Sequence, residues 1–151
     1  TVTNITRYTY VKFAEDYPIP KEPTFKKSEE EYKKDLDQQS YNVLRNHGTE
    51  RPWTSEYNKD YSTGLYKCKA CGDDLFDAST KFDSGCGWPA FNAPIGDEKS
   101  VLFRRDTSHG MDRTEVICSN CHSHLGHVFT DGYKQDTGLR YCINGVCLVK
   151  K

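Results

Sequence analysis

Two cysteine pairs of the form Cys-x-x-Cys constrain this chain more than any other feature of its sequence. They are Cys68–Cys71 and Cys118–Cys121. Each pair can turn two thiolates inward through one tight turn, and together they offer the four sulfur ligands of a tetrahedral Zn²⁺ site. Neither motif lies between a predicted strand and a predicted helix, as a thioredoxin-like redox pair would. The sequence therefore predicts a structural Zn²⁺ site that clamps two distant parts of one domain.

Length and charge exclude several classes of protein. The chain has 151 residues and a formal net charge of -1, which fits one domain and gives no basic field for nucleic acid. No stretch approaches the ~18 consecutive apolar residues of a membrane span. We expect a monomer that binds neither nucleic acid nor membrane.

The cysteine count and the first residues bear on the compartment. Seven cysteines are an odd number, which suits metal ligands and reactive thiols in a reducing compartment better than a disulfide framework. Residues 1–10 lack the apolar core of a signal peptide. We expect a cytoplasmic protein. Because the chain begins with Thr1, an organelle leader ahead of it stays an open alternative.

Local signals predict an arm and a helical cap before the β-rich part. Residues 1–27 carry three prolines among mixed charges and are expected to form an irregular arm, followed by one domain over 28–151. Ser28 with Glu31 three residues later is typical of a capping box. The helical pattern runs to about Asn46, with a break near Asp37.

Short strands separated by turns dominate the rest of the chain. Asn144-Gly145 is the strongest hairpin signal in the sequence, because this dipeptide favours two-residue turns between paired strands. The predicted fold is one mainly-β domain with an N-terminal helical cap. Its strands are expected at 64–70, 101–105, 114–118, 127–130, 138–143 and 146–150.

Three cysteines remain for reactive roles. Cys142 shares one face of a predicted strand with Arg140, and a neighbouring cation lowers the pKa of a thiol. Cys86 lies between glycines in an irregular loop, where an accessible thiol could resolve an oxidised partner. Cys147 would face Cys142 across the predicted hairpin, so it could resolve Cys142 or merely pack beside it. A small buried hydrophobe is the alternative reading of any lone cysteine.

A histidine cluster follows the second cysteine pair. It includes His124 and His127, for which general acid–base work is the preferred role, because four cysteines already fill the metal site. A second metal on these two histidines with Asp131 stays an alternative. His47 and His109 are expected to be ordinary surface histidines.

In this combination the residues resemble the methionine sulfoxide reductases of type B. The resemblance covers about residue 48 to 148, and its motifs follow one another in the family's order. They are Gly48–Pro52, the two Cys-x-x-Cys pairs, Gly85–Pro89, Arg113–Val116, His124–Phe129 and Arg140–Asn144.

The resemblance implies two antiparallel β-sheets in a β-tent-like arrangement with N-terminal helices. It implies thiol-dependent reduction of methionine-R-sulfoxide, since the two sulfoxide epimers need separate enzymes. A cysteine sulfenic acid and then an intramolecular disulfide would form, and thioredoxin or a similar dithiol would recycle it.

The same resemblance implies a role for each site residue. Cys142 matches the nucleophile and Cys86 the resolving cysteine. The remaining matches are His124, His127 and Asn144 for orienting the sulfoxide oxygen and delivering protons, Arg140 for activating the thiol, Trp88 and Asp131 for lining the substrate pocket, and Cys68, Cys71, Cys118 and Cys121 for binding structural zinc.

Two other classes of function compete with this reading. A zinc-knuckle module that binds nucleic acid or protein would also carry two Cys-x-x-Cys pairs, but it would have no reactive thiol outside the metal site. A thiol peroxidase or redox sensor would reduce peroxide without preferring one sulfoxide epimer.

Overall fold

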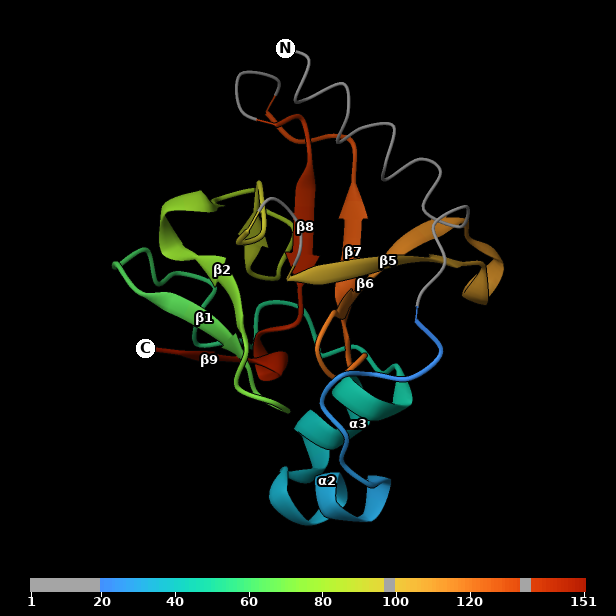
Figure 1. Ribbon diagram of the computed structural model, residues 1–151. Helices are drawn as coiled ribbons and strands as arrows, with labels where there is room; N and C mark the ends of the chain where they lie inside the picture. The colour runs from blue at the N-terminus through green and yellow to red at the C-terminus, as the bar shows by residue number, and fades with distance from the viewer. Residues whose placement is uncertain (1–19, 97–99, 134–136) are drawn as a thin grey trace.

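A computed structural model of the protein describes residues 20–96, 100–133 and 137–151. In these residues, antiparallel strands form two sheets, and two helices lie at one end of the strands (Figure 1). The predicted mainly-β fold with two antiparallel sheets and N-terminal helices is confirmed. Residues 1–19 of the predicted arm lie outside the described part of the chain.

The two helices begin where the sequence predicts. Helix α2 spans Glu29–Asp35, and α3 spans Gln38–Asn46. The capping box is present, because the Ser28 hydroxyl accepts a hydrogen bond from the Glu31 amide while the Glu31 carboxylate accepts one from the Ser28 amide. Asp37 caps α3 at the expected break by accepting from the Ser40 amide at 3.1 Å.

All strand pairings within the described residues are antiparallel. The smaller sheet has the order β2-β1-β9, and the larger has the order β3-β4-β8-β7-β6-β5. The strands are β1 Leu65–Cys68, β2 Asp74–Asp77, β3 Lys81–Phe82, β4 Ala90–Phe91, β5 Val101–Asp106, β6 Arg113–Cys118, β7 His124–Phe129, β8 Arg140–Ile143 and β9 Leu148–Lys150.

The predicted hairpin at Asn144-Gly145 is wrong. Strand β8 pairs with β4 and β7 in the larger sheet, whereas β9 pairs with β1 in the smaller one. A type I′ turn needs positive φ at both central residues, but Asn144 has φ -66° and begins a 3₁₀ helix over Gly145–Cys147. The chain therefore crosses from one sheet to the other at this point, and Cys147 does not face Cys142.

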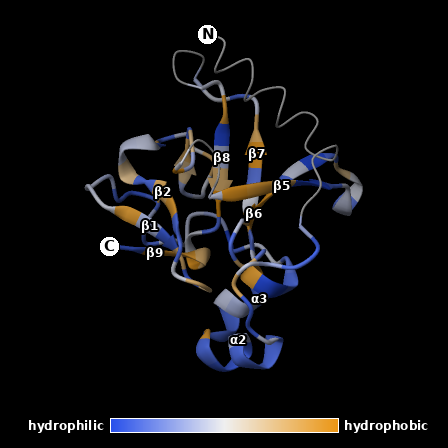
Figure 2. Cartoon of the chain, viewed as in Figure 1, coloured by the Kyte–Doolittle hydropathy of each residue, from blue (hydrophilic) through white to orange (hydrophobic). Residues whose placement is uncertain are grey.

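Aromatic side chains from both sheets fill the core between them. Phe76 of β2 stacks on Phe91 of β4 with ring centroids 4.4 Å apart, and Tyr141 of β8 meets Phe76 edge-on. Figure 2 shows apolar residues along the central strands, whereas α2 is mostly hydrophilic. Tyr32 of α2 and Leu44 of α3 are nevertheless buried and join the core. Within the described residues, no helix has the length and apolar character needed to cross a membrane.

Candidate functional site

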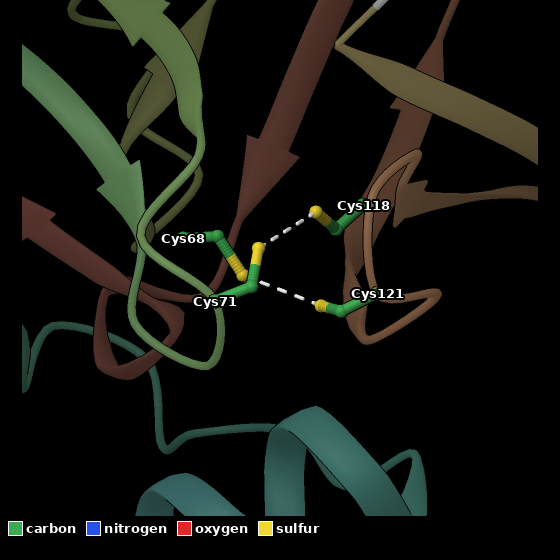
Figure 3. A group of neighbouring side chains, drawn as sticks. All are labelled: Cys68, Cys71, Cys118 and Cys121. Atoms are coloured by element: carbon green, nitrogen blue, oxygen red, sulfur yellow. Dashed lines mark hydrogen bonds between the residues drawn. The ribbon is translucent and has the colours of Figure 1, made fainter. Parts of the chain in front are cut away.

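The two Cys-x-x-Cys pairs form facing turns at the ends of β1 and β6. In each turn the first cysteine's carbonyl accepts a backbone hydrogen bond, from Gly72 to Cys68 and from His122 to Cys118. Figure 3 shows the sulfur atoms of the two turns directed at one another. The Sγ atoms lie 3.7 Å apart between Cys68 and Cys121 and 3.6 Å apart between Cys71 and Cys118.

These distances fit a tetrahedral metal ion. With metal–sulfur bonds of about 2.3 Å, the edge of a tetrahedron of sulfurs is roughly 3.8 Å long. Three of the four cysteines are buried and Cys71 is partly buried. The four predicted ligands therefore converge on one buried site with the geometry of a metal centre.

A row of polar side chains crosses the larger sheet on the face opposite Phe91, Phe103 and Tyr141. In the strand register Arg104 pairs with Glu115, Glu115 with His127, and His127 with Cys142. Directly paired residues project from the same face of a sheet. Gly126 lets β8 come close, because a Cβ there would lie 2.1 Å from the Cys142 carbonyl oxygen. The register thus lines up a thiol, an imidazole and a carboxylate.

Cys142 opens into a pocket of about 270 Å³. Its Sγ lies 3.3 Å from the Sγ of Cys86, which comes from the loop between β3 and β4. Cys86 is partly buried, and its loop is held by hydrogen bonds such as Gly85 N–H to Asp83. The pocket is lined by Thr49, Cys86, Trp88, Arg113, Gly126, His127, Phe129, Arg140, Cys142 and Asn144. The two thiols need little movement to form a bond.

The hydrogen bond between the two thiols favours one negative charge on the pair, held mainly by Cys86. The hydrogen bond from Cys142 lowers the pKa of the Cys86 thiol to about 5, and the charge of Arg140 adds to this effect. The pKa of Cys142 is raised, first by its hydrogen bond to Cys86 and then by burial, and Arg140 only partly offsets this. The sequence argument that Arg140 would lower the pKa of Cys142 was therefore incomplete, because it left out the neighbouring thiol. Moving one proton along the S–H···S hydrogen bond transfers the charge to Cys142.

Arg140 is fixed beside this pair. Its guanidinium donates to both oxygens of Asp131, at 2.9 Å and 3.1 Å, and lies 4.4 Å from the ring centroid of Phe129. Asp131 is exposed and does not line the pocket. Asp131 therefore contacts Arg140 from outside the pocket. It can orient the guanidinium without touching a molecule bound beside Cys142.

His127 is paired with a carboxylate that the sequence analysis missed. Its Nε2 lies 2.7 Å from Oδ2 of Asp106. Burial would raise the pKa of Asp106, but hydrogen bonds from Ser108 and His127 outweigh it and hold this pKa below its usual range. Burial also lowers the pKa of His127. A neutral ring that donates from Nε2 to Asp106 leaves Nδ1 as a proton acceptor.

His124 lies outside the pocket of Cys142. It is buried and lines a neighbouring cavity of about 500 Å³, where its Nδ1 meets Oε2 of Glu115 at 2.5 Å. His47 is exposed at the surface, as expected, but it is not solitary, because its Nδ1 lies 3.1 Å from the same oxygen. Arg104 holds the other oxygen of Glu115 at 2.8 Å. Burial would raise the pKa of Glu115, but the His124 and Arg104 contacts lower it to about 2.

Glu50, also missed, connects three parts of the pocket wall. Its backbone N–H donates to Oδ1 of Asn144, and its carbonyl accepts from the Trp88 indole, each at 3.0 Å. Its buried carboxylate accepts from the amides of Gly145 and Val146 at 2.7 Å and 3.1 Å. The Asn144 amide also donates to the Leu125 carbonyl, so both ends of that side chain are engaged by the protein.

The structure therefore brings together most, but not all, of the predicted site residues. Cys86, Trp88, His127, Arg140, Cys142 and Asn144 line one pocket, whereas His124 and Asp131 stand behind its walls. Cys147 is fully buried, and its thiol donates to the His124 carbonyl. Glu50 and Glu115 fall within motifs that carried the family resemblance, which was the available signal for them. Asp106 had no such signal.

Comparison with known proteins gives a consistent result. The SelR domain family matches residues 36–151. "Peptide methionine sulfoxide reductase MsrB" of Pseudomonas syringae pv. syringae (strain B728a) is 57% identical over 122 residues, which span 81% of this chain and 92% of the relative. The protein of the same name from Pseudomonas putida (strain W619) is also 57% identical over 122 residues, spanning 81% of this chain and 90% of that one. The resemblance seen in the sequence is confirmed: the chain belongs to the SelR-domain family of MsrB-type peptide methionine sulfoxide reductases.

Proposed function

We propose that this protein reduces methionine-R-sulfoxide, protein-bound and possibly free, with Cys142 as nucleophile and Cys86 as resolving thiol. The observation that carries the proposal is the 3.3 Å separation of their Sγ atoms in a pocket that also holds Trp88, His127 and Arg140. An aromatic wall suits the methyl group of the substrate, and the polar groups suit its oxygen. The preference for the R epimer rests on family membership.

The reaction proceeds in three balanced steps. The Cys142 thiolate attacks the sulfoxide sulfur while the oxygen takes up a proton relayed by His127. The oxygen then moves to the Cys142 sulfur: a cysteine S–O bond forms while the methionine S–O bond and the transient bond between the two sulfurs break, so methionine leaves and a sulfenic acid remains. The Cys86 thiol then displaces the sulfenic oxygen as water and forms a disulfide. Thioredoxin or a similar dithiol reduces this disulfide by exchange and is itself oxidised.

The remaining residues position these groups in the proposal. Arg140, fixed by Asp131, stabilises the thiolate on Cys142. Asn144 fixes the turn after β8 and forms part of the pocket wall. His124 acts from the neighbouring cavity, where it holds Glu115 in the polar row beside His127.

We further propose that the four-cysteine cluster binds Zn²⁺. Four thiolates at tetrahedral spacing favour this ion, and a closed S₄ site leaves no coordination position for substrate. When bound, the ion would supply structural support only. Cys68, Cys71, Cys118 and Cys121 would hold it between the ends of β1 and β6.

Three wider features complete the proposal. Residues 28–151 would form a single reductase domain preceded by an arm of residues 1–27, in line with the SelR match over 36–151. The protein is also proposed to act as a monomer. The odd number of cysteines suits metal ligands and reactive thiols, which supports a reducing compartment such as the cytoplasm.

A single-turnover assay with separated R and S sulfoxides tests the function. The reduced protein should convert the R epimer and leave the S epimer unchanged. Cys142→Ser should abolish this first turnover. Cys86→Ser should keep the first turnover but lose recycling by thioredoxin, and Cys147→Ala serves as the matched control that still recycles. Peroxide should be reduced much more slowly than the R sulfoxide.

Two outcomes would contradict the proposal. Equal turnover of both epimers, or of peroxide, would favour a general thiol peroxidase. Normal recycling by Cys86→Ser would remove Cys86 from the mechanism.

A further inference from the structure

Exposed aromatic side chains gather around the loop that carries Cys86. Among the described residues, four large hydrophobic side chains are exposed, and three of them are aromatic: Trp53 at 63%, Tyr61 at 51% and Tyr133 at 50%. All three contact or flank the segment Phe82–Gly87. We call these three side chains the aromatic rim. Single exposed hydrophobics are ordinary, but a group of them marks an interaction site.

The rim is fixed in place by the Cys86 loop. The Trp53 amide donates to the Gly87 carbonyl at 2.7 Å, and a Cβ on Gly87 would lie 3.3 Å from the Trp53 indole nitrogen. Tyr133 packs on the start of the same segment, with its ring centroid 5.3 Å from that of Phe82 and its hydroxyl 3.5 Å from the Asp83 carbonyl oxygen. Tyr61 lines the same narrow crevice as Trp53 and Cys86. A partner that covers these rings therefore meets a preorganised surface.

The rim lies outside the substrate pocket. None of its three residues lines the cavity of Cys142, whereas Cys86 and Trp88 line both that cavity and the crevice of Trp53 and Tyr61. Cys86 therefore borders both the substrate pocket and the crevice beside the rim, so a molecule on the rim can approach Cys86 without occupying the substrate pocket. This arrangement separates the two reactants of the catalytic cycle.

Thiol exchange determines which partner fits this position. An external thiolate must approach one sulfur of the Cys86–Cys142 disulfide in line with the S–S bond. Cys142 is on β8, between β4 and β7, whereas Cys86 is on a loop whose residues Asp83 and Gly85 are exposed. A protein whose thiol attacks Cys86 from outside must place its surface over the adjoining rings.

We propose that Trp53, Tyr61 and Tyr133 form the docking surface for the protein dithiol that reduces the Cys86–Cys142 disulfide. This inference rests on the proposed function, since it assumes that this disulfide forms during turnover. Trp and Tyr are the side chains that most often dominate the binding energy of protein interfaces. A small dithiol needs no docking surface, so only a protein reductant should depend on the rim.

The test starts from the disulfide itself. The protein is oxidised with one equivalent of diamide, and peptide mapping verifies the Cys86–Cys142 bond. Stopped-flow measurement then gives the second-order rate constant for reduction by thioredoxin and by dithiothreitol. The variants are Trp53→Ala, Tyr61→Ala, Tyr133→Ala and all three together, with Met111→Ala as a matched control because Met111 is the fourth exposed large hydrophobic.

The triple variant should react with thioredoxin at least about 10-fold more slowly, and the single variants about 3-fold or more. Reduction by dithiothreitol should stay within 2-fold of the wild type (roughly one-half kcal/mol). An unchanged thioredoxin rate in the triple variant overturns the proposal. An equal loss with both reductants also overturns it, because the rings would then only shape the Cys86 loop.

Two further results separate this inference from the proposed function. If the triple variant raises the KM for an oxidised protein substrate and leaves the thioredoxin rate unchanged, the rim is a substrate surface and the inference fails. If the wild type reduces no sulfoxide but its disulfide reacts with thioredoxin in a rim-dependent way, the proposed function fails while the docking surface stands.

Discussion

The protein contains two groups of close sulfur atoms, and they differ in everything but distance. In the four-cysteine cluster, sulfurs 3.6 Å and 3.7 Å apart are held by tight backbone turns, and most are buried. In the Cys86–Cys142 pair, sulfurs 3.3 Å apart come from a loop and a strand at an open pocket. Arg140 lowers the pKa of both thiols of the pair, whereas the cation near the cluster, Arg45, donates to the Cys121 carbonyl and to the Glu29 carboxylate. Access, rather than proximity, thus distinguishes a reactive thiol pair from a metal site.

Loss of one metal ligand should have the largest effect. Cys121→Ser should abolish metal binding and lower the free energy of unfolding by at least about 5 kcal/mol, since structural metal sites contribute their binding energy to folding. Urea unfolding together with metal content measures this. Cys142→Ser should change stability by about 1 kcal/mol or less. Comparable losses of unfolding free energy in both variants would contradict the distinction between the four-cysteine cluster and the Cys86–Cys142 pair.

Loss of the Glu115 charge should have an intermediate effect on the free energy of unfolding. Glu115 belongs to the polar row and lies on β6, the strand that also carries Cys118 of the cluster. Its pKa falls from 4.5 to about 2 on folding. A lowered folded pKa contributes stability that is complete above the unfolded value and is lost as the pH falls through about 2. The contribution is about 3 kcal/mol at neutral pH.

Comparison of the wild type with Glu115→Gln measures this contribution. The difference in urea unfolding free energy should shrink between pH 5 and pH 2. A metal ion bound by the cluster would be released in acid from both proteins, so that effect cancels in the difference. A difference that does not depend on pH would show that the Glu115 charge has no net role.

Removal of the cation beside the pair should have the smallest effect. Arg140 helps to lower the pKa of both Cys86 and Cys142. Arg140→Leu should therefore raise the midpoint of the alkylation pH profile of this pair by about one unit. Iodoacetamide labelling followed by peptide mapping measures it, and the four cluster cysteines in the same digest are the internal control. An unchanged midpoint would assign the low pKa to the thiol pair alone.

Much of the fold could be predicted because its signals are local. The capping box at Ser28 and the N-cap at Asp37 act within one helical turn, so the sequence alone locates α2 and α3. The longer strands β5 and β6 were also predicted within one residue at each end. Strands β2, β3 and β4 were missed, because β3 and β4 have only two residues each and β2 lacks clean alternation.

The errors arose where tertiary contacts override a local preference. Asn144-Gly145 favours a hairpin in isolation, but Glu50 binds the amides that follow Asn144, and its own N–H holds the Asn144 side chain. His47 looked solitary in sequence, yet it lies 68 positions from Glu115 and shares that carboxylate with His124. The convergence of the four cysteines was predictable, because the Cys-x-x-Cys spacing is itself typical of the ligands of a tetrahedral metal site.

The contacts of Glu50 have a consequence for how the pocket can change. Asn144 and Trp88 are anchored to its main-chain N–H and C=O, which every amino acid at position 50 except proline would retain. Only the hydrogen bonds from the 145–146 amides depend on the Glu50 side chain. The positions of Asn144 and Trp88 in the pocket wall therefore depend on the path of the backbone at Glu50. A substitution of Glu50 would release only the 145–146 amides, whereas an insertion or deletion of a single residue would also displace the anchors of Asn144 and Trp88.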